Sequence, residues 1–297
     1  MDGFAGFELT EVETPRGRVC ARVGGSGPPL LLLHGFPQTH LMWHPVASRL
    51  AAEHTVVAAD LPGYGASFRP EPAADHAPHS KRALAQDVAA AMAALGHERF
   101  AVAGHDRGGR VGYRMALDHP DTVTRLAVLD IVPTGEIWRL ADDRFASGYW
   151  HWTFLSQAAP LPERMILGDP AGFWIAIQRM GIKEDDERYP ATVVDAYRDQ
   201  LADPETVTAI CEDYRAGATI DRALDDADRG VRTIACPARA LWGGAGALPR
   251  FYEDPLELWR PLAPGVTGRA VEGASHFLVE DAPGEVADDL AGFLAAG

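Results

Sequence analysis

Short apolar runs that alternate with helical patterns constrain the fold of this 297-residue chain more than any other feature. Leu30–Leu33 is continuously apolar, which is typical of a strand buried on both faces of a sheet. Three further runs share this character and two helical segments lie between them: Thr55–Ala59, Phe100–Ala103 and Leu126–Leu129, with helices over Lys81–Leu95 and from about Arg107 to His119. This alternation predicts an α/β fold with a mostly parallel sheet and helices on both faces.

The second half of the chain predicts an insertion into this fold. From residue 131 to residue 230 the strand-like runs give way to aromatic helical patches such as Tyr149–Leu155. A strand pattern returns at Ala238–Gly243. We therefore expect an α/β core formed by residues 1–130 and 231–297, with a helical cap formed by residues 131–230.

The charge balance excludes some classes of partner. The 42 Asp and Glu residues outnumber the 27 Lys and Arg residues, which gives a formal net charge of −15. Such a chain repels nucleic acid and anionic membranes at long range, so we expect neither as a partner. An anionic small-molecule ligand would need an attraction that is built locally.

Cysteine usage and the N-terminal segment bear on the compartment. Cys20, Cys211 and Cys236 are odd in number and widely spaced, so neither a disulfide framework nor a metal-binding pattern is visible. The N-terminal segment lacks the layout of a secretory signal, and no apolar run approaches the length needed to span a membrane. We expect a cytoplasmic protein that holds no metal.

The segment GHDRGG, Gly104–Gly109, lies between a predicted strand and a predicted helix. Small residues on both sides of the central residue are typical of a nucleophile elbow, a strained strand–turn–helix that exposes one side chain. The central residue is Asp106 rather than serine. Because a carboxylate suits displacement at an sp³ carbon, Asp106 is the candidate nucleophile and would form an alkyl ester. The alternative is a glycine-rich junction with a capping aspartate.

The segment HGFPQ, His34–Gln38, follows the Leu30–Leu33 run directly. In α/β-hydrolases, which use this kind of elbow, the loop at this point supplies one oxyanion-hole N–H, and the residue after the nucleophile supplies the other. We therefore expect the backbone N–H groups of Phe36 and Arg107 to form an oxyanion hole. His34 itself is expected to be structural.

Chain order suggests the two partners of the nucleophile. His276, in EGASHFLVEDAP, follows a late strand and precedes the last helix, so we expect it to be the general base. Asp130 ends the strand after the elbow helix, whereas the later strand is followed by LWGGAGALPR without a carboxylate. We therefore assign Asp130 as the acid that orients His276. A helix cap at Asp130 and a surface histidine at 276 are the alternatives.

Two arginines point to an anionic substrate. Arg107 and Arg110 are three residues apart at the start of a helix, on one helix face, where the helix dipole disfavours cations. Guanidinium groups can hold a substrate carboxylate with paired hydrogen bonds. Ion pairing with nearby acids is the alternative.

The helical insertion supplies candidate halide donors. His151 and Trp152 bring N–H groups into the apolar patch YWHWTFL, and Tyr214 in CEDYRAG offers an O–H. A halide leaving group needs such donors in a dry pocket. From spacing alone, core packing is the simpler interpretation of this patch.

Taken together, GHDRGGRVGYRMALDHP, HGFPQTHLMWHPVA, the His-Trp pair, CEDYRAG and GASHFL resemble the fluoroacetate dehalogenases, a haloacetate-specific branch of the α/β-hydrolases. The resemblance runs from about Leu30 to the C-terminal helix. It implies hydrolysis of a 2-haloacetate to glycolate and halide, no cofactor, and a homodimer. It also implies the roles given above: the triad Asp106, His276 and Asp130, the carboxylate clamp Arg107 and Arg110, and the halide pocket His151, Trp152 and Tyr214.

One departure bears on the halogen. Family members that handle fluoride well carry a further cap Trp some distance after a Gly-Asp-Pro. Here that tripeptide is Gly168–Pro170, but Trp174 follows it too early, and the corresponding turn holds Met180 and Gly181. The resemblance therefore implies that chloroacetate or bromoacetate is a better substrate than fluoroacetate.

Other functions are compatible with some of these residues. Epoxide hydrolases and haloalkane dehalogenases also use an Asp nucleophile in this fold, but a neutral substrate gives the two arginines nothing to bind. Epoxide hydrolases also need two cap tyrosines, for which four candidates exist: Tyr149, Tyr189, Tyr197 and Tyr214. A non-catalytic binding protein on the same fold is the remaining alternative.

Overall fold

The computed structural model describes residues 2–184 and 186–296. Eight strands form one sheet in the order β1-β2-β4-β3-β5-β6-β7-β8. The strands are β1 Glu8–Thr14, β2 Gly17–Gly25, β3 Pro29–Leu33, β4 Thr55–Ala59, β5 Phe100–His105, β6 Val123–Leu129, β7 Ala238–Gly243 and β8 Thr267–Val271. β2 pairs antiparallel with both β1 and β4, and every later pairing is parallel. The predicted mostly parallel α/β sheet is confirmed.

The strands at the centre of this sheet are fully apolar because both of their faces are covered. Leu30–Leu33 of β3 pairs with β4 on one side and with β5 on the other, and all four leucines are buried. Burial of a leucine side chain contributes about 1.5–3 kcal/mol to folding. These central strands therefore give the loops at their carboxyl ends a rigid base.

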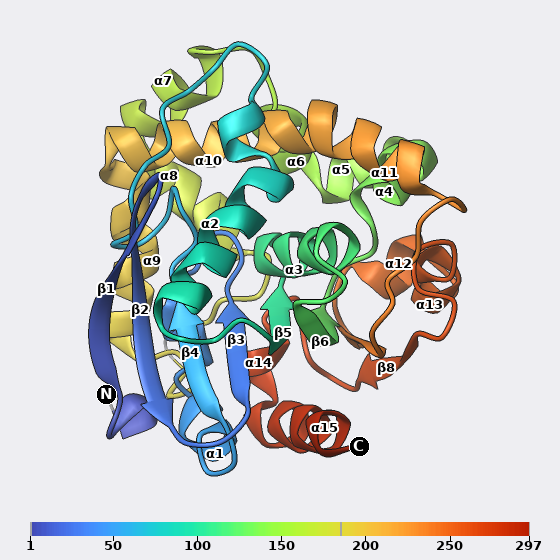
Figure 1. Cartoon of the computed structure of the whole chain (residues 1–297). Helices are drawn as coiled ribbons and strands as arrows, with labels where there is room; N and C mark the ends of the chain where they lie inside the picture. The colour runs from blue at the N-terminus through green and yellow to red at the C-terminus, as the bar shows by residue number, and fades with distance from the viewer. Residues whose placement is uncertain (1, 185, 297) are drawn as a thin grey trace.

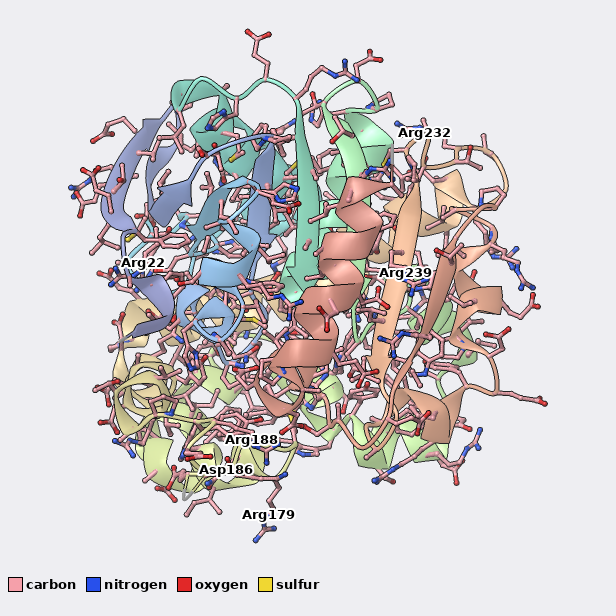
Figure 2. The ribbon with its side chains drawn as sticks, turned by 90° about the horizontal axis from the view of Figure 1, so that it is seen from below. Arg22, Arg179, Asp186, Arg188, Arg232 and Arg239 are labelled. Atoms are coloured by element: carbon pink, nitrogen blue, oxygen red, sulfur yellow. The ribbon has the colours of Figure 1, made fainter. Side chains whose placement is uncertain are left out.

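The helices that do not lie between β6 and β7 in the sequence belong to the core. Those before β7 are η1 Asp2–Phe4, η2 His40–Trp43, α1 Ala47–Leu50, η3 Ala77–His79, α2 Lys81–Ala94 and α3 Arg107–Asp118; those after β7 are α12 Leu248–Phe251, α13 Pro255–Trp259, α14 Leu278–Asp281 and α15 Pro283–Ala295. α2 and α3 lie on one face of the sheet, and α1 and α15 contact each other on the other (Figures 1 and 2).

A long run of helices separates β6 from β7 in the sequence. They are α4 Thr134–Leu140, α5 Asp143–Gly148, α6 Trp150–Leu155, α7 Leu161–Gly168, α8 Pro170–Gln178, α9 Ala191–Asp199, η4 Gln200–Ala202, α10 Pro204–Ala216, η5 Gly217–Asp221 and α11 Arg222–Asp228. Most of them gather above the sheet in Figure 1, and we call them the cap helices. The division into core and cap at residues 131 and 230 stays a prediction.

Among residues 2–184 and 186–296, no helix is both long enough and apolar enough to cross a membrane.

Candidate active site

The turn between β5 and α3 has the geometry of a nucleophile elbow. Asp106 has φ 43° and ψ −114°, a strained conformation for a residue with a side chain. A Cβ atom on Gly108 would lie 2.4 Å from the carbonyl oxygens of Leu33 and His34. Because glycine has no side chain, the first turn of α3 can pack directly against the end of β3. The Asp106 side chain then lies above the edge of the sheet.

The loop after β3 holds the Asp106 carboxylate. The backbone N–H of Phe36 donates to Asp106 Oδ1 at 3.0 Å. A Cβ atom on Gly35 would lie 2.4 Å from Asp106 Cβ, so glycine is required for this approach. The predicted second donor, the N–H of Arg107, makes no hydrogen bond to this carboxylate in the described part of the chain, and its role stays a prediction.

His34 in the same loop has a structural environment. Its Nδ1 donates to the Gly35 carbonyl at 2.9 Å, and its Nε2 accepts from the Leu61 N–H at 3.0 Å. Burial lowers the pKa of His34, so the ring is neutral and satisfies both contacts. These contacts tie the loop after β3 to the loop after β4.

Asp106 is ionised. Burial would raise the pKa of this carboxyl, but the nearby charges of His276, Arg107 and Arg110 outweigh burial and hold the pKa at about 2. Asp106 is therefore a carboxylate at neutral pH, as its predicted role as a nucleophile requires.

His276 and Asp130 meet across the carboxyl ends of β6 and β8. His276 Nδ1 donates to Asp130 Oδ2 at 2.6 Å, and the Gly243 N–H donates to Asp130 Oδ1 at 2.9 Å. Burial lowers the pKa of His276, but the hydrogen bond and charge of Asp130, together with Asp106, outweigh burial and raise it. The pair leaves His276 Nε2 to act as a base.

His105 fixes the base from the other side, a contact that sequence reasoning missed. Its Nε2 donates to the His276 carbonyl at 2.8 Å, and the two rings lie 4.6 Å apart between centroids. Burial holds the pKa of His105 at about 3, so it adds no positive charge beside the base. Its place next to Asp106 in the elbow was the available signal.

The guanidinium of Arg107 is held by a buried acid rather than turned freely into the site. Its Nε donates to Asp213 Oδ2 at 2.7 Å and its Nη2 donates to the Asp213 carbonyl at 2.9 Å. Lys81 and the Tyr64 hydroxyl also donate to the Asp213 carboxylate. Its remaining nitrogen, Nη1, is buried and has no partner in the described structure. Guanidinium carbon Cζ lies 4.1 Å from the centroid of the Tyr214 ring.

Arg110 lies on the same side of α3. Its Nη1 donates to the Val132 carbonyl and to Thr134 Oγ1, both at 3.0 Å, and its Cζ lies 4.7 Å from the centroid of the Trp152 ring. Its Nε is buried without a partner among the described residues. Both predicted arginines therefore keep a buried donor unused.

A small closed cavity joins these groups, and we call it the inner cavity. It is lined by Phe36, Asp106, Arg110, Asp130, Tyr149, His151, Trp152, Met180, Tyr214 and His276. All of the predicted site residues line it except Arg107. Its volume is about 10 Å³, close to the least that holds one water. Only a small ligand fits this space.

The predicted halide donors lie on its cap side. His151, Trp152 and Tyr214 are each at most 3% exposed. Burial lowers the pKa of His151 to about 3 and raises that of Tyr214 well above its usual value, so both are neutral. His151 Nδ1 has no partner in the residues that the structure describes. These rings form an apolar wall that carries hydrogen-bond donors.

The cap position discussed for fluoride is occupied by Met180. Trp174 does not line the inner cavity, and its Nε1 donates instead to Glu184 Oε1 at 2.7 Å. Met180, which follows the end of α8, lines the cavity. At this point the cavity is therefore lined by a thioether, which carries no hydrogen-bond donor.

Within the described ranges, no group of three or more His, Cys, Asp or Glu residues is arranged to hold a metal ion. The positive charges at the site come from arginines and, when it is protonated, from His276.

Comparisons with known proteins agree with this geometry. Residues 28–173 match the α/β hydrolase fold family. A crystal structure of a protein from Nostoc sp PCC 7120, described only as an α/β hydrolase, superposes with a TM-score of 0.95 at 43% identity, covering 99% of this chain and 100% of that one.

Two curated relatives differ in their similarity. A soluble epoxide hydrolase from Corynebacterium sp. is 31% identical over 91% of each chain. A fluoroacetate dehalogenase from Burkholderia sp. is 45% identical, covering 98% of this chain and 95% of that protein. Because nearly the whole of both chains aligns at this identity, the chain belongs to the fluoroacetate dehalogenase family of the α/β hydrolases.

Proposed function

We propose that this protein hydrolyses 2-haloacetates to glycolate and halide through an ester on Asp106. The observation that carries the proposal is the inner cavity, where an ionised carboxylate faces a guanidinium and neutral N–H and O–H groups. The similarity to the Burkholderia fluoroacetate dehalogenase supports the same reaction.

In the first step, a carboxylate oxygen of Asp106 attacks the α-carbon of the substrate. The new C–O bond forms as the carbon–halogen bond breaks, and the halide leaves with the bonding electrons. The unused donors of Arg107 and Arg110 hold the substrate carboxylate. His151, Trp152 and Tyr214 stabilise the charge that develops on the halide.

In the second step, His276 removes a proton from water, and the hydroxide attacks the ester carbonyl of Asp106. The Phe36 N–H already contacts this carboxylate, and with the Arg107 N–H it would hold the tetrahedral oxyanion. Collapse breaks the ester C–O bond, and the departing glycolate oxygen takes the proton from His276. The Asp106 carboxyl loses the remaining proton of the water to solvent, which restores the carboxylate. Asp130 stabilises His276 while the imidazole carries the extra proton.

Halide release from fluoroacetate, chloroacetate and bromoacetate tests the proposal, with Asp106→Ala as the control. We expect bromide and chloride to be released faster than fluoride, because Met180 offers no N–H in place of the missing Trp. We expect no release by Asp106→Ala. Absence of release from all three acids by the wild-type protein would overturn the proposal.

A single turnover in ¹⁸O-labelled water tests the ester. The label should enter the Asp106 carboxylate, because water attacks the enzyme carbonyl and not the substrate carbon. His276→Asn should trap the ester as a mass increase on the protein after treatment with bromoacetate. Label that appears only in glycolate would rule out the ester.

Epoxide hydrolysis is the second candidate, and one observation favours it. Tyr149 and Tyr214 both line the inner cavity, where two tyrosines could protonate an epoxide oxygen. Tyr189 and Tyr197 are instead hydrogen-bonded to Asp281 and Glu280. Diol formation from a small neutral epoxide, without halide release from any haloacetate, would favour this reaction.

A further inference from the structure

A second, larger cavity adjoins the inner cavity, and we call it the outer vestibule. Its volume is about 320 Å³, and it is lined by Gly148, Tyr149, Trp150, Ala176, Arg179, Met180, Ala245, Gly246, Ala247, Arg250, Ser275 and His276. It shares Tyr149, Met180 and His276 with the inner cavity. These three side chains therefore lie at the boundary between the vestibule and the cavity that holds Asp106.

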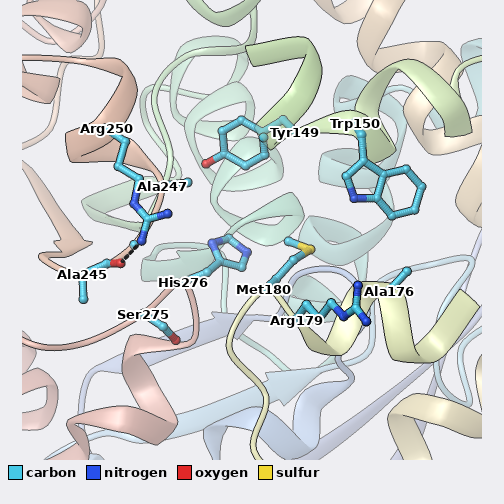
Figure 3. A pocket seen from close by; sticks show the side chains of 12 residues that line it. Tyr149, Trp150, Ala176, Arg179, Met180, Ala245, Ala247, Arg250, Ser275 and His276 are labelled. Carbon is cyan, nitrogen blue, oxygen red and sulfur yellow. Dashed lines mark hydrogen bonds between the residues drawn. The ribbon is translucent and has the colours of Figure 1, made fainter. Parts of the chain in front are cut away.

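The vestibule is formed where the cap meets the core. α8 supplies Ala176, and Arg179 and Met180 follow it, while the loop after β7 and helix α12 supply Arg250 on the opposite side. Figure 3 shows His276 and Met180 between the two arginines, with Tyr149 above them. Arg179 and Arg250 thus flank the route to the base and the nucleophile.

The charge of this cavity is opposite to that of the whole chain. None of its lining residues is acidic, although the chain carries a net charge of −15. Within the described ranges, neither Arg179 nor Arg250 forms an ion pair. Other exposed arginines do, as Arg144 does with Asp142.

The two guanidinium groups differ in how they are held. Arg250 Nη2 donates to the Ala245 carbonyl at 3.3 Å, which keeps its charge at the cavity rim. Arg179 is exposed, and Figure 2 shows it projecting from the edge of the molecule. Both arginines are therefore exposed, and of the two only Arg250 has a side-chain hydrogen bond among the described residues.

We propose that the outer vestibule is an anion-entry subsite, where Arg179 and Arg250 bind the carboxylate of an incoming haloacid before it passes Tyr149 and Met180. The proposal rests on the proposed function for the identity of the anion, but an anionic vestibule ligand can be tested without turnover. A net negative protein repels such a substrate at long range, so local cations raise its concentration at the entrance. Guanidinium groups are suited to a carboxylate because they offer paired donors.

Iodide quenching of Trp150 tests the charge of the vestibule directly. Trp150 lines the cavity, and its fluorescence is the difference between wild type and Trp150→Phe, measured in each arginine background. We expect Arg179→Gln with Arg250→Gln to lower the iodide quenching constant of Trp150 about threefold at low salt. Quenching by neutral acrylamide should not change.

The matched control removes the same charge elsewhere. Arg164 in α7 and Arg99 are exposed, line neither cavity and form no ion pair in the described structure. Arg164→Gln with Arg99→Gln should leave iodide quenching of Trp150 unchanged. Equal quenching by iodide in the two double variants would overturn the proposal.

The kinetic test uses bromoacetate and stopped-flow tryptophan fluorescence. The association rate constant should fall about tenfold in Arg179→Gln with Arg250→Gln at low salt, and kcat for bromide release should stay within about twofold. The difference should vanish near 1 M salt, where the Debye length is about 3 Å. An unchanged association rate would overturn the proposal. If the wild-type protein released no bromide, the proposed function would fail, and the iodide result would still decide the vestibule.

Discussion

The triad of Asp106, His276 and Asp130 differs in its hydrogen bonding from the donors on the facing side of the site. We call these donors, on Arg107, Arg110 and His151, the donor wall. In the triad, Asp130 is held by His276 and by the Gly243 N–H, and Asp106 is held by the Phe36 N–H, all without a ligand. On the facing side, buried nitrogens have no partner in the described chain, namely Arg107 Nη1, Arg110 Nε and His151 Nδ1. Buried donors are normally paired, so we expect an anion to complete this side. The predicted nucleophile and base are hydrogen-bonded without a ligand, whereas these three nitrogens have no partner among the described residues until an anion binds.

The largest effect is expected when the hydrogen bond between Asp130 and His276 is lost. Asp130→Asn removes the acceptor that fixes the tautomer of His276, so kcat should fall about 10³–10⁴-fold. Burial lowers the pKa of His276 and Asp130 raises it, so the variant should also shift the acid limb of the pH profile to lower pH. Steady-state halide release across pH measures both effects. A variant with an unshifted acid limb would show that Asp130 does not tune the base.

A smaller effect is expected at Asp213, whose carboxylate holds the Arg107 guanidinium. Asp213→Asn should free the Arg107 guanidinium and raise KM for bromoacetate about 10–100-fold, because about 1.4 kcal/mol of lost binding energy is tenfold. The matched control is Asp221→Asn, since Asp221 accepts from Lys81 but does not contact Arg107. Both variants should melt at lower temperature, but only Asp213→Asn should change KM. Equal KM values would show that Arg107 is held without Asp213.

The next effect should differ between chloride and bromide as leaving groups. His151→Phe keeps an aromatic ring against Phe36 and removes both ring nitrogens. We expect chloride release to fall about tenfold and bromide release to fall less, because chloride is the poorer leaving group and depends more on hydrogen-bond donors. Parallel kcat measurements for the two acids check this ratio. Equal losses would indicate that His151 acts through packing.

The smallest effect concerns stability rather than rate. Glu280 is fully buried, accepts from Gln38 Nε2 at 2.5 Å and from the Tyr197 hydroxyl at 3.3 Å, and is followed by Asp281. Burial raises the pKa of Glu280 to about 8, from 4.5. Between these values the folded chain keeps a proton that the unfolded chain loses, so stability falls as pH rises and levels off above about 8.

Glu280→Gln removes this titration. The melting temperature of the wild-type protein should therefore drop by about 10 °C more than that of the variant between about pH 5 and pH 8, because each pH unit between the two pKa values costs about 1.4 kcal/mol and about 1 kcal/mol corresponds to about 2–4 °C. Calorimetry at several pH values measures the difference. Parallel curves for the two proteins would show that Glu280 is ionised in the fold.

The core could be predicted from the sequence because its signals are local. The apolar run at Leu30–Leu33 forms β3, and the spacing of glycines around Asp106 requires a tight turn. The loop positions of Asp130 and His276 follow from the order of strands, and the structure brings the two side chains together. Their catalytic roles, like those of the other site residues, remain predictions.

The cap could be predicted only in outline, because its contacts join distant parts of the chain. The patch Tyr149–Leu155 is helical as expected, with Tyr149 at the N-cap of α6, but the short helix α5 directly before it was not foreseen. The partner of Arg107 is Asp213, which lies 106 residues away. No local pattern indicates such a pair, although Asp213 precedes Tyr214 in CEDYRAG.

The ion cluster around Asp213 limits how the cap of one such enzyme can be joined to the core of another. Asp213 comes from a cap helix, whereas Lys81 and Arg107 come from the first turns of two core helices. A chimaera that takes its cap from one parent and its core from another inherits this cluster from both. If the donor cap lacks Asp213, the buried Arg107 loses its counter-charge, and Lys81 keeps only its ion pair with Asp221. Libraries of cap exchanges should therefore treat these three positions as one inherited unit.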